Sequence, residues 1–513
     1  MQFAALIFLC APILIALFSR RLATEWRLRK LAKANGCKPV RQLRSRLPFA
    51  LDLKWRVFQH RGSILDDVIF QVYRDQGTWI FSSDSTLDRS ISAADPRVIQ
   101  AILATHFRDW GLGQSRARAV GPLLGRGVFT SDGEVWQHAR GVLRPQFTKA
   151  QVSDVATVER HVQALFAAMG AASPTNGWTR TRNLMPLLLR FTLDNTTDFL
   201  YGQSLHSQTH MAGAHEGSPE ALHAASFEKA FTDANSGAQL RLKAGPFYWL
   251  FRSRAFVAAC ATWQEHGTRL VDAALGREKQ ENRYCFVDGL AESTDDRALM
   301  RDLSIQLLFA GEDTSASLLA FTLRCLALHP GAWDRLRREV LEFFGTQAQP
   351  VREVTFASLK ECAPLQNVLK ETLRLYPPVP MNAREALRDT VLPVGGGPDG
   401  NAPVAVAKGT VVKYSPYVMQ RREDIWGPDA LEWKPDRWVG RRVGWEYLPF
   451  NGGPRICIGQ QFALTEIAYA VVRILQHFDD VQGGDFEPAI STTWSTALFP
   501  KHGVPLSFHV AAE

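Results

Sequence analysis

A cysteine in a glycine-rich loop is the residue of this sequence best placed to do chemistry. The segment FNGGPRICIGQQF covers residues 450–462 and places Cys457 directly ahead of a long apolar stretch. A thiolate at the start of a helix meets backbone N–H groups and the positive end of the helix dipole, which stabilise its charge. Arg455 adds a cation two residues earlier. The loop therefore favours an ionised sulfur at Cys457.

The residues around Cys457 indicate which metal centre its sulfur would bind. Zinc sites usually need several Cys or His residues at short spacing, and none accompany Cys457 in the sequence. A lone thiolate suits an axial ligand of haem iron. The alternative is a structural cysteine at a helix start, which leaves the neighbouring glycines and arginine unexplained. The loop also matches the ten-residue pattern F-x-x-G-x-R-x-C-x-G at Phe450, Gly453, Arg455, Cys457 and Gly459.

This pattern resembles the haem-thiolate loop of the cytochrome P450 superfamily. The resemblance implies haem b as the cofactor and Cys457 as the axial ligand of its iron. It places Phe450, Arg455 and Gly459 beside the porphyrin. It also implies the fold of that superfamily, which is mainly α with minor β sheet.

The segment AGEDT, residues 310–314, is a second candidate site. On a helix, Ala310 and Thr314 lie one turn apart on one face. A threonine hydroxyl can bond the carbonyl one turn earlier and open a groove, and Gly311 lets a ligand approach the backbone. Taken alone, the segment also suits an ordinary helix with a solvated acidic face. It resembles the family's A-G-x-[DE]-T motif, which implies that Thr314 and Asp313 deliver protons and that Ala310 borders the haem.

Haem propionates require hydrogen-bond donors, and the sequence offers candidates for them. Trp136 and Arg140 present an indole N–H and a guanidinium on one helix face. An amphipathic surface helix is the alternative reading of this pair. The pair resembles the family's W-x-x-x-R propionate clamp. Arg384 and Arg455 also match family positions that reach propionates.

Glu371 and Arg374 lie at i, i+3, where an isolated helix gains about 0.2–0.5 kcal/mol from a surface ion pair. A surface pair is therefore the simplest interpretation of these two residues alone. Together with Arg437 in the segment KPDRW, residues 434–438, they resemble the family's buried Glu-Arg-Arg network. Buried charges persist only when they are mutually paired. The resemblance implies a structural role, which is to hold the haem loop.

Composition fits a large globular protein. Of 513 residues, 46% are hydrophobic and 21% are charged, and the seven cysteines form no disulfide framework. The formal net charge is +8, but no basic run interleaved with aromatics indicates nucleic-acid binding. The excess of positive charge favours an anionic membrane surface or an acidic protein partner. Apolar periodicity predicts helices over 302–329, 361–376 and 457–478, and β-prone segments lie at 391–394 and 404–412.

The N-terminus predicts a membrane anchor. Residues 2–18 carry no charge and are followed directly by basic residues, an order that favours a retained signal anchor over a cleaved signal peptide. We therefore expect an anchor over residues 1–20, a basic, proline-containing connector over 21–50 and a catalytic domain over 51–513. We also expect a single-pass protein of the endoplasmic reticulum membrane whose catalytic domain lies in the cytosol.

Longer strings narrow the resemblance to one group of the superfamily. The segments GRGVFTSDG at 125–133, RPQF at 144–147, GGGPDG at 395–400 and 450–466 resemble fungal enzymes that hydroxylate n-alkanes and fatty acids, and their secondary-metabolism relatives. The resemblance implies hydroxylation of an apolar, lipid-like substrate with O₂. Electrons would come from NADPH through a separate flavoprotein reductase, NADPH-cytochrome P450 reductase, with cytochrome b5 as a further donor. The alternative is oxidative tailoring of a fungal polyketide or terpenoid.

Apolar segments are candidates for the substrate pocket. We expect Phe309, Val379, Met381 and Trp494 to line it. Two rival functions stay open at this point, a haem-thiolate isomerase that needs no reductase and a non-enzymatic haem-binding protein. The Asp313–Thr314 pair argues against the isomerase, because such a reaction needs no proton delivery.

Overall fold

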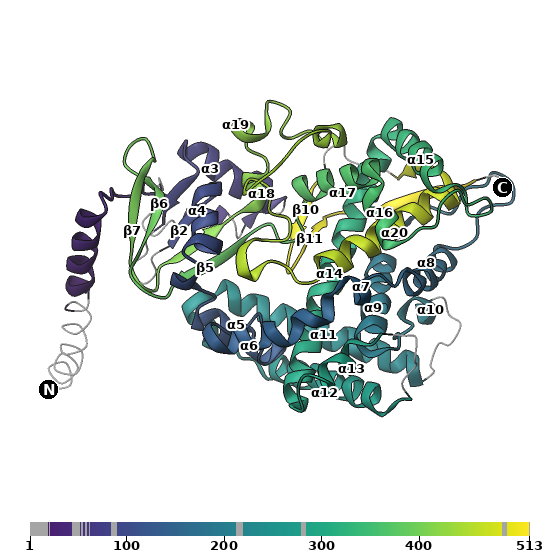
Figure 1. The fold of residues 1–513 in the computed structure, drawn as a ribbon, viewed down its shortest axis with the longest axis horizontal. Helices are drawn as coiled ribbons and strands as arrows, with labels where there is room; N and C mark the ends of the chain where they lie inside the picture. The colour runs from purple at the N-terminus through teal and green to yellow at the C-terminus, as the bar shows by residue number, and fades with distance from the viewer. Residues whose placement is uncertain are drawn as a thin grey trace.

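Helices make up most of the molecule and a strand-rich part lies at one end (Figure 1). The computed structural model describes residues 19–511 except for 20, 44–51, 53–54, 57–58, 61, 84–89, 212–218, 279–283 and 485–489. The α-helices are α3 Gln71–Gln76, α4 Pro96–Gln100, α5 Gln114–Leu124, α6 Gly133–Leu143, α7 Lys149–Val152, α8 Val155–Met169, α9 Met185–Tyr201, α10 Ser207–Met211, α11 Pro219–Lys243, α12 Arg254–Gly276, α13 Phe286–Ala291, α14 Arg297–Leu328, α15 Pro330–Phe344, α16 Phe356–Glu361, α17 Ala363–Leu375, α18 Pro416–Met419, α19 Glu423–Trp426 and α20 Gln460–His477.

The strands form one larger sheet and several small ones. The five-stranded sheet has the order β1-β2-β8-β5-β3, and within it only β2 and β8 run parallel. The strands are β1 Ile80–Ser82, β2 Ser90–Ala93, β3 Trp110–Gly111, β4 Arg182–Asn183, β5 Asn382–Ala386, β6 Thr390–Gly396, β7 Ala402–Val406, β8 Val411–Tyr414, β9 Phe478–Gly483, β10 Thr492–Trp494, β11 Leu498–Pro500 and β12 Pro505–Val510. The prediction of a mainly helical fold with minor sheet is confirmed.

Helix α14 passes through the centre of the helical part (Figure 1). The Asp296 side chain caps it by accepting the Leu299 N–H, and the helix ends two residues before Pro330. Up to Leu308 its side chains pack in a core shared with α11 and α12. From Ala316 they pack in a second core shared with α15, α17 and α20. The segment between these cores is the predicted AGEDT site.

The predicted helices are all present, with shifted ends. Helix α14 begins at Arg297 rather than at 302, because Asp296 supplies its cap. Helix α17 begins at Ala363 with Pro364 in its first turn, and α20 begins at Gln460. The residues before Gln460 form a short 3₁₀ turn and a loop, so Cys457 lies ahead of the helix and not on it. The β-prone segment 404–412 is divided between β7 and β8.

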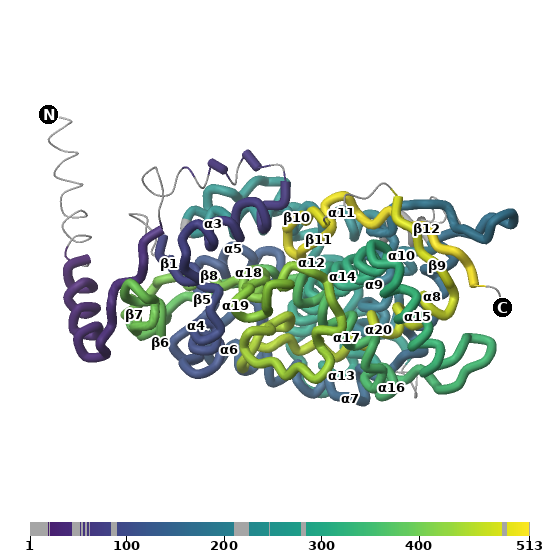
Figure 2. The backbone as a smooth tube through the Cα atoms, turned by 90° about the horizontal axis from the view of Figure 1, so that it is seen from above, coloured from purple at the N-terminus to yellow at the C-terminus, as the bar shows by residue number. Residues whose placement is uncertain are grey.

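The N-terminal helix lies at one end of the molecule and the C-terminus at the other (Figure 2). Residues 21–34 are helical, which is the first part of the segment that we expected to be a connector. The predicted anchor falls almost wholly on residues outside the described part. No helix in the described part is long and apolar enough to cross a membrane. The anchor and the domain boundaries therefore stay predictions.

Candidate active site

The loop around Cys457 is fixed by backbone contacts. The Cys457 N–H donates to the Phe450 carbonyl at 2.9 Å, which closes the loop. Asn451 and Gly453 both adopt left-handed backbone conformations, with φ of 64° and 67°. A side chain at Gly453 would collide with the carbonyl oxygen of Leu103, because the loop lies directly against that backbone. Glycine is therefore required at this position of the pattern.

The Cys457 sulfur is accessible although protein surrounds it. Of the free cysteines in the described residues, Cys457 is the exposed one. Nevertheless, burial raises the pKa of its thiol, while the Gly459 backbone N–H and the Arg140 charge lower it. The thiol is therefore accessible to solvent although protein atoms surround it. The N–H and the guanidinium would stabilise the thiolate there.

One face of α14 is also partly accessible, although most of the helix is buried. Ala310, Asp313 and Thr314 are partly exposed, although the helix is buried on both sides of them. The Thr314 hydroxyl donates to the Ala310 carbonyl at 2.6 Å, as the sequence predicted. Burial raises the pKa of Asp313. These three residues form a partly exposed face of α14 between the two helical cores.

Gly311 also lies at a close contact between two helices. A Cβ atom at this glycine would lie 3.1 Å from the Thr196 hydroxyl oxygen of α9. Gly311 therefore allows α14 and α9 to pack closely, and its predicted role in the approach of a ligand stays a prediction.

Three arginines from separate elements meet near the loop. Arg116 of α5 donates to Asn382 Oδ1 at 2.8 Å, and Arg384 of β5 donates to the same oxygen at 3.4 Å. Burial, together with the nearby arginine charges, lowers the pKa of both Arg116 and Arg455 to about 10. Asp132 offsets part of this repulsion, through an ion pair with Arg455 at 2.6 Å.

This arginine cluster fits a ligand that carries carboxylates. Buried charges of one sign repel each other and favour a counter-charge among them. In addition, the Nε atoms of Arg384 and Arg455 are buried and have no hydrogen-bond partner. The two propionates of haem would supply both the counter-charge and the acceptors. Arg116 was missed at the sequence level because no motif marks it, and only the fold brings its side chain from α5 to Asn382 of β5.

The predicted donors Trp136 and Arg140 instead contact the cysteine loop. Arg140 Nη2 donates to the Ile456 carbonyl at 2.8 Å, one residue before Cys457. The Trp136 ring lies under the Arg455 guanidinium, 4.3 Å from the ring centre. Both residues of α6 thus support the loop and its arginine. Their predicted contact with propionates stays a prediction.

The predicted Glu-Arg-Arg network forms. The Glu371 and Arg374 side chains are fully buried and share two hydrogen bonds of 2.8 Å. Arg437 Nε donates to Glu371 at 3.2 Å. Glu371 also accepts the Lys434 backbone N–H at 2.9 Å and the Trp438 indole N–H at 3.0 Å. The network joins α17 to the segment that leads toward the Cys457 loop.

The predicted pocket segments come together beside α14. The Leu498 N–H donates to the Pro378 carbonyl at 3.0 Å, and the Ser317 hydroxyl donates to the Leu498 carbonyl at 2.5 Å. Phe309 packs against Phe231 of α11, with ring centres 6.1 Å apart. The remaining candidates are Val379, 40% exposed, Trp494, 37% exposed, and Met381, which packs on a small core around Leu498.

Comparison with known proteins agrees with this arrangement. From residue 80 to residue 506 the chain matches the family model described as Cytochrome P450. The chain belongs to the cytochrome P450 family. This protein is a cytochrome P450 monooxygenase, as the resemblance of its motifs implied, and the family implies a haem-thiolate centre.

Relatives of this cytochrome P450 occur among fungi. It is 42% identical over 519 residues to cytochrome P450 monooxygenase milC of Cordyceps militaris, a match that covers 98% of each chain. It is 40% identical over 449 residues to cytochrome P450 52A13 of Debaryomyces hansenii, covering 86% of this chain and 85% of the relative. In fold it is similar to the crystal structure of the cytochrome P450DA heme domain, with a TM-score of 0.73 at 23% identity, covering 93% of this chain and 98% of that one.

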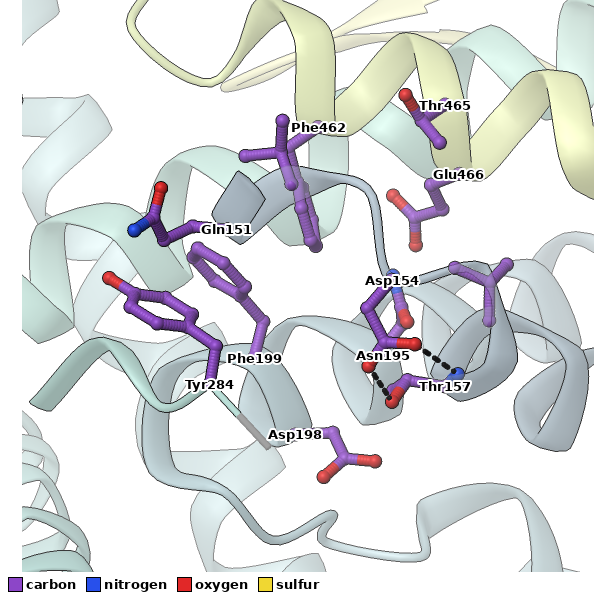
Figure 3. Close-up of a pocket in the computed structure, with 12 residues that line it drawn as sticks. Gln151, Asp154, Thr157, Asn195, Asp198, Phe199, Tyr284, Phe462, Thr465 and Glu466 are labelled. Carbon is purple, nitrogen blue, oxygen red and sulfur yellow. Dashed lines mark hydrogen bonds between the residues drawn. The ribbon is translucent and has the colours of Figure 1, made fainter. Parts of the chain in front are cut away.

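This cytochrome P450 also has a small polar cavity, shown in Figure 3, which contains none of the predicted haem or substrate residues. Glu466 of α20 reaches into it toward Asn195 of α9 (Figure 3). Glu466 is 1% exposed, and neither carboxyl oxygen has a partner at hydrogen-bond geometry. Burial raises the pKa of Glu466 to about 8, although nearby Asn195 and Ser315 lower it slightly. Burial therefore favours the protonated form of Glu466 at neutral pH.

We expect Glu466→Gln to stabilise the protein increasingly as the pH rises from 5 to 8. In this range the unfolded chain ionises Glu466, whereas the folded protein keeps it neutral, so the wild type loses stability as the pH rises. At pH 7 this ionisation lowers the free energy of unfolding of the wild type by about 3 kcal/mol relative to acidic pH. The glutamine variant does not lose this stability, because its side chain does not ionise. Thermal unfolding of both proteins across this range measures the difference. The exposed Glu342→Gln is the control, and a difference for Glu466→Gln that does not change with pH would contradict the prediction.

Proposed function

We propose that this monooxygenase hydroxylates C–H bonds of an apolar, lipid-like substrate, with O₂ and with electrons from NADPH supplied through a separate reductase. The observation that carries the proposal is the presence, in one chain, of an accessible Cys457 sulfur and a partly exposed face of α14 formed by Ala310, Asp313 and Thr314. It combines an accessible sulfur with proton-carrying groups. The apolar segments beside it suit a lipid-like substrate.

The residues present fit haem b. Cys457 would hold the iron, and Arg116, Arg384 and Arg455 would hold the propionates. Bound haem supplies the activation of O₂, which a thiolate ligand favours. The protein supplies orientation, exclusion of water and protons.

Thr314 and Asp313 are the proposed proton carriers. Because burial raises the pKa of Asp313, its carboxyl can carry a proton closer to neutral pH than an exposed aspartate can. The Thr314 hydroxyl can pass a proton on, since it both donates and accepts. Its bond to the Ala310 carbonyl holds it on the partly exposed face of α14.

The substrate would lie against Phe309, Val379, Met381 and Trp494. Large apolar and aromatic side chains bind lipid-like molecules by removing their surface from water. We propose that the protein is anchored in the endoplasmic reticulum membrane with its catalytic domain in the cytosol. NADPH-cytochrome P450 reductase, and cytochrome b5 as a further donor, would reach it there, and the net charge of +8 suits acidic partners.

Reconstitution tests this function. Microsomes that contain the protein and the reductase are incubated with fatty acids and, in a second arm, with fungal polyketides and terpenoids. Products are identified by mass spectrometry. Hydroxylated fatty acids whose formation requires both NADPH and reductase support the proposal. Hydroxylation of polyketides or terpenoids, without hydroxylation of fatty acids, assigns the protein to secondary metabolism. Turnover without reductase would indicate an isomerase instead.

We expect Thr314→Ala to retain haem but to lower product formation at least about tenfold, because a positioned proton carrier contributes about 10² or more to a rate. Reducing equivalents should then be released as peroxide. The measurement is product and peroxide formed per NADPH consumed. Thr314→Ser, which retains the hydroxyl, is the matched control and should keep most of the coupling. Equal coupling in Thr314→Ala and wild type would remove Thr314 from proton delivery.

A further inference from the structure

A small, partly buried polar cluster contacts Asp313 from outside its own helix. The Thr496 hydroxyl, in the turn between β10 and β11, donates to Asp313 Oδ2 at 2.9 Å. Asn235 Nδ2 and Gln239 Nε2 of α11 donate to the Thr496 oxygen at 3.0 and 3.4 Å. Gln239 Nε2 also lies 3.3 Å from Asn235 Oδ1. We call Thr496, Asn235 and Gln239 the Thr496 cluster.

The donors and acceptors of this cluster fix the direction of its hydrogen bonds. A threonine hydroxyl has one proton, and both amide groups donate to the Thr496 oxygen, so its proton is directed to Asp313. Amide N–H groups do not give up protons at neutral pH. The cluster therefore cannot conduct protons from α11 to Asp313. What it can do is fix where the Asp313 carboxyl points.

We propose that Thr496 is a positioning residue that orients the Asp313 carboxyl for proton delivery. Because Asn235 of α11 bonds to Thr496, the orientation of Asp313 then depends on the position of α11. The proposal rests on the proposed role of Asp313. Helix α11 also carries Phe231, which packs on the predicted pocket residue Phe309. A substrate that moves α11 would thus act on Asp313 through Asn235 and Thr496.

The proposal predicts the direction in which the pKa of Asp313 changes when Thr496 is replaced. Burial raises the pKa of Asp313, and the bond from Thr496 lowers it. Removal of that hydroxyl should raise the pKa of Asp313 further. The adjacent carboxyl, Glu312, is buried, and it interacts with charges on its own helix, on α11 and on α9, namely Asp313, Glu228, Arg190 and Asp194. These groups are unchanged in a Thr496 variant.

The test compares Thr496→Val, Thr496→Ser and Thr493→Val in the reconstituted holoenzyme. Thr493 lies in the same hairpin, is exposed and serves as the control. We expect Thr496→Val to keep the carbon monoxide spectrum, to lower product per NADPH about threefold or more, and to move the midpoint of the pH profile of coupling to higher pH. Thr496→Ser should restore both values. Coupling and midpoint in Thr496→Val equal to those of Thr493→Val would overturn the proposal.

Two further variants separate this proposal from the one on which it rests. Asp313→Asn should uncouple turnover. If it does not, the proposed role of Asp313 fails, and with it this inference. If Asp313→Asn uncouples and Thr496→Val does not, only the positioning role fails. Asn235→Ala should lower coupling in the same direction as Thr496→Val, and wild-type coupling in Asn235→Ala would overturn the dependence on α11.

Discussion

Cys457→Ala is expected to abolish product formation and the carbon monoxide spectrum typical of a thiolate ligand. The family makes this accessible sulfur the expected iron ligand, and alanine has no donor atom. Haem content, the spectrum of the reduced carbon monoxide complex and turnover with reductase measure the effect. Normal turnover or an unchanged spectrum in this variant would contradict the assignment of Cys457.

The loop itself should survive this substitution. Its closing bond joins the backbone N–H of Cys457 to the Phe450 carbonyl, so it does not involve the sulfur. Circular dichroism should therefore show the wild-type helical content in Cys457→Ala, which separates loss of the ligand from loss of the fold. Cys37→Ala is the control, because Cys37 is also a free and partly accessible cysteine but lies far from Cys457 along the chain.

Glu371→Gln is expected to prevent accumulation of stable, haem-loaded protein. Its carboxylate receives two bonds from Arg374, one from Arg437, one from a backbone N–H and one from the Trp438 indole. The amide loses the negative charge and leaves the buried Arg374 without its counter-charge. Breaking a buried pair costs about 3–5 kcal/mol, a large share of the roughly 5–15 kcal/mol by which proteins are stable.

Thermal unfolding and haem content measure this effect. Glu361→Gln is the matched control, because Glu361 pairs with Arg352 but its side chain is 54% exposed. Such exposed pairs contribute little to stability. Glu371→Gln with a wild-type unfolding midpoint and full haem content would show that the network does not hold the loop.

Short-range patterns predicted the parts of the site that lie within one segment. The Cys457 loop, the Thr314 bond to Ala310 and the Glu371–Arg374 pair each involve residues at most a few positions apart along the chain. Their contacts follow from local backbone geometry, which can be predicted from the spacing of the residues in the sequence. The same reasoning located the long helices, although their ends moved by a few residues because caps such as Asp296 decide them.

Contacts between segments that lie far apart along the chain could not be predicted from the sequence. Arg116 meets Arg384 and Arg455 because α5 packs beside the sheet and the loop. Gly311 faces Thr196 because α14 and α9 lie close together.

The sequence alone therefore predicted the chemistry proposed for this protein, namely a single thiolate, a proton-carrying helix face and cations for propionates. The tertiary structure decided which arginines gather near the loop, which face of α14 is partly exposed and which side chains bond to Asp313. The physical reason is that a local motif sets its own backbone conformation, whereas the charge, burial and orientation of a side chain depend on elements that fold against it from more than a hundred residues away.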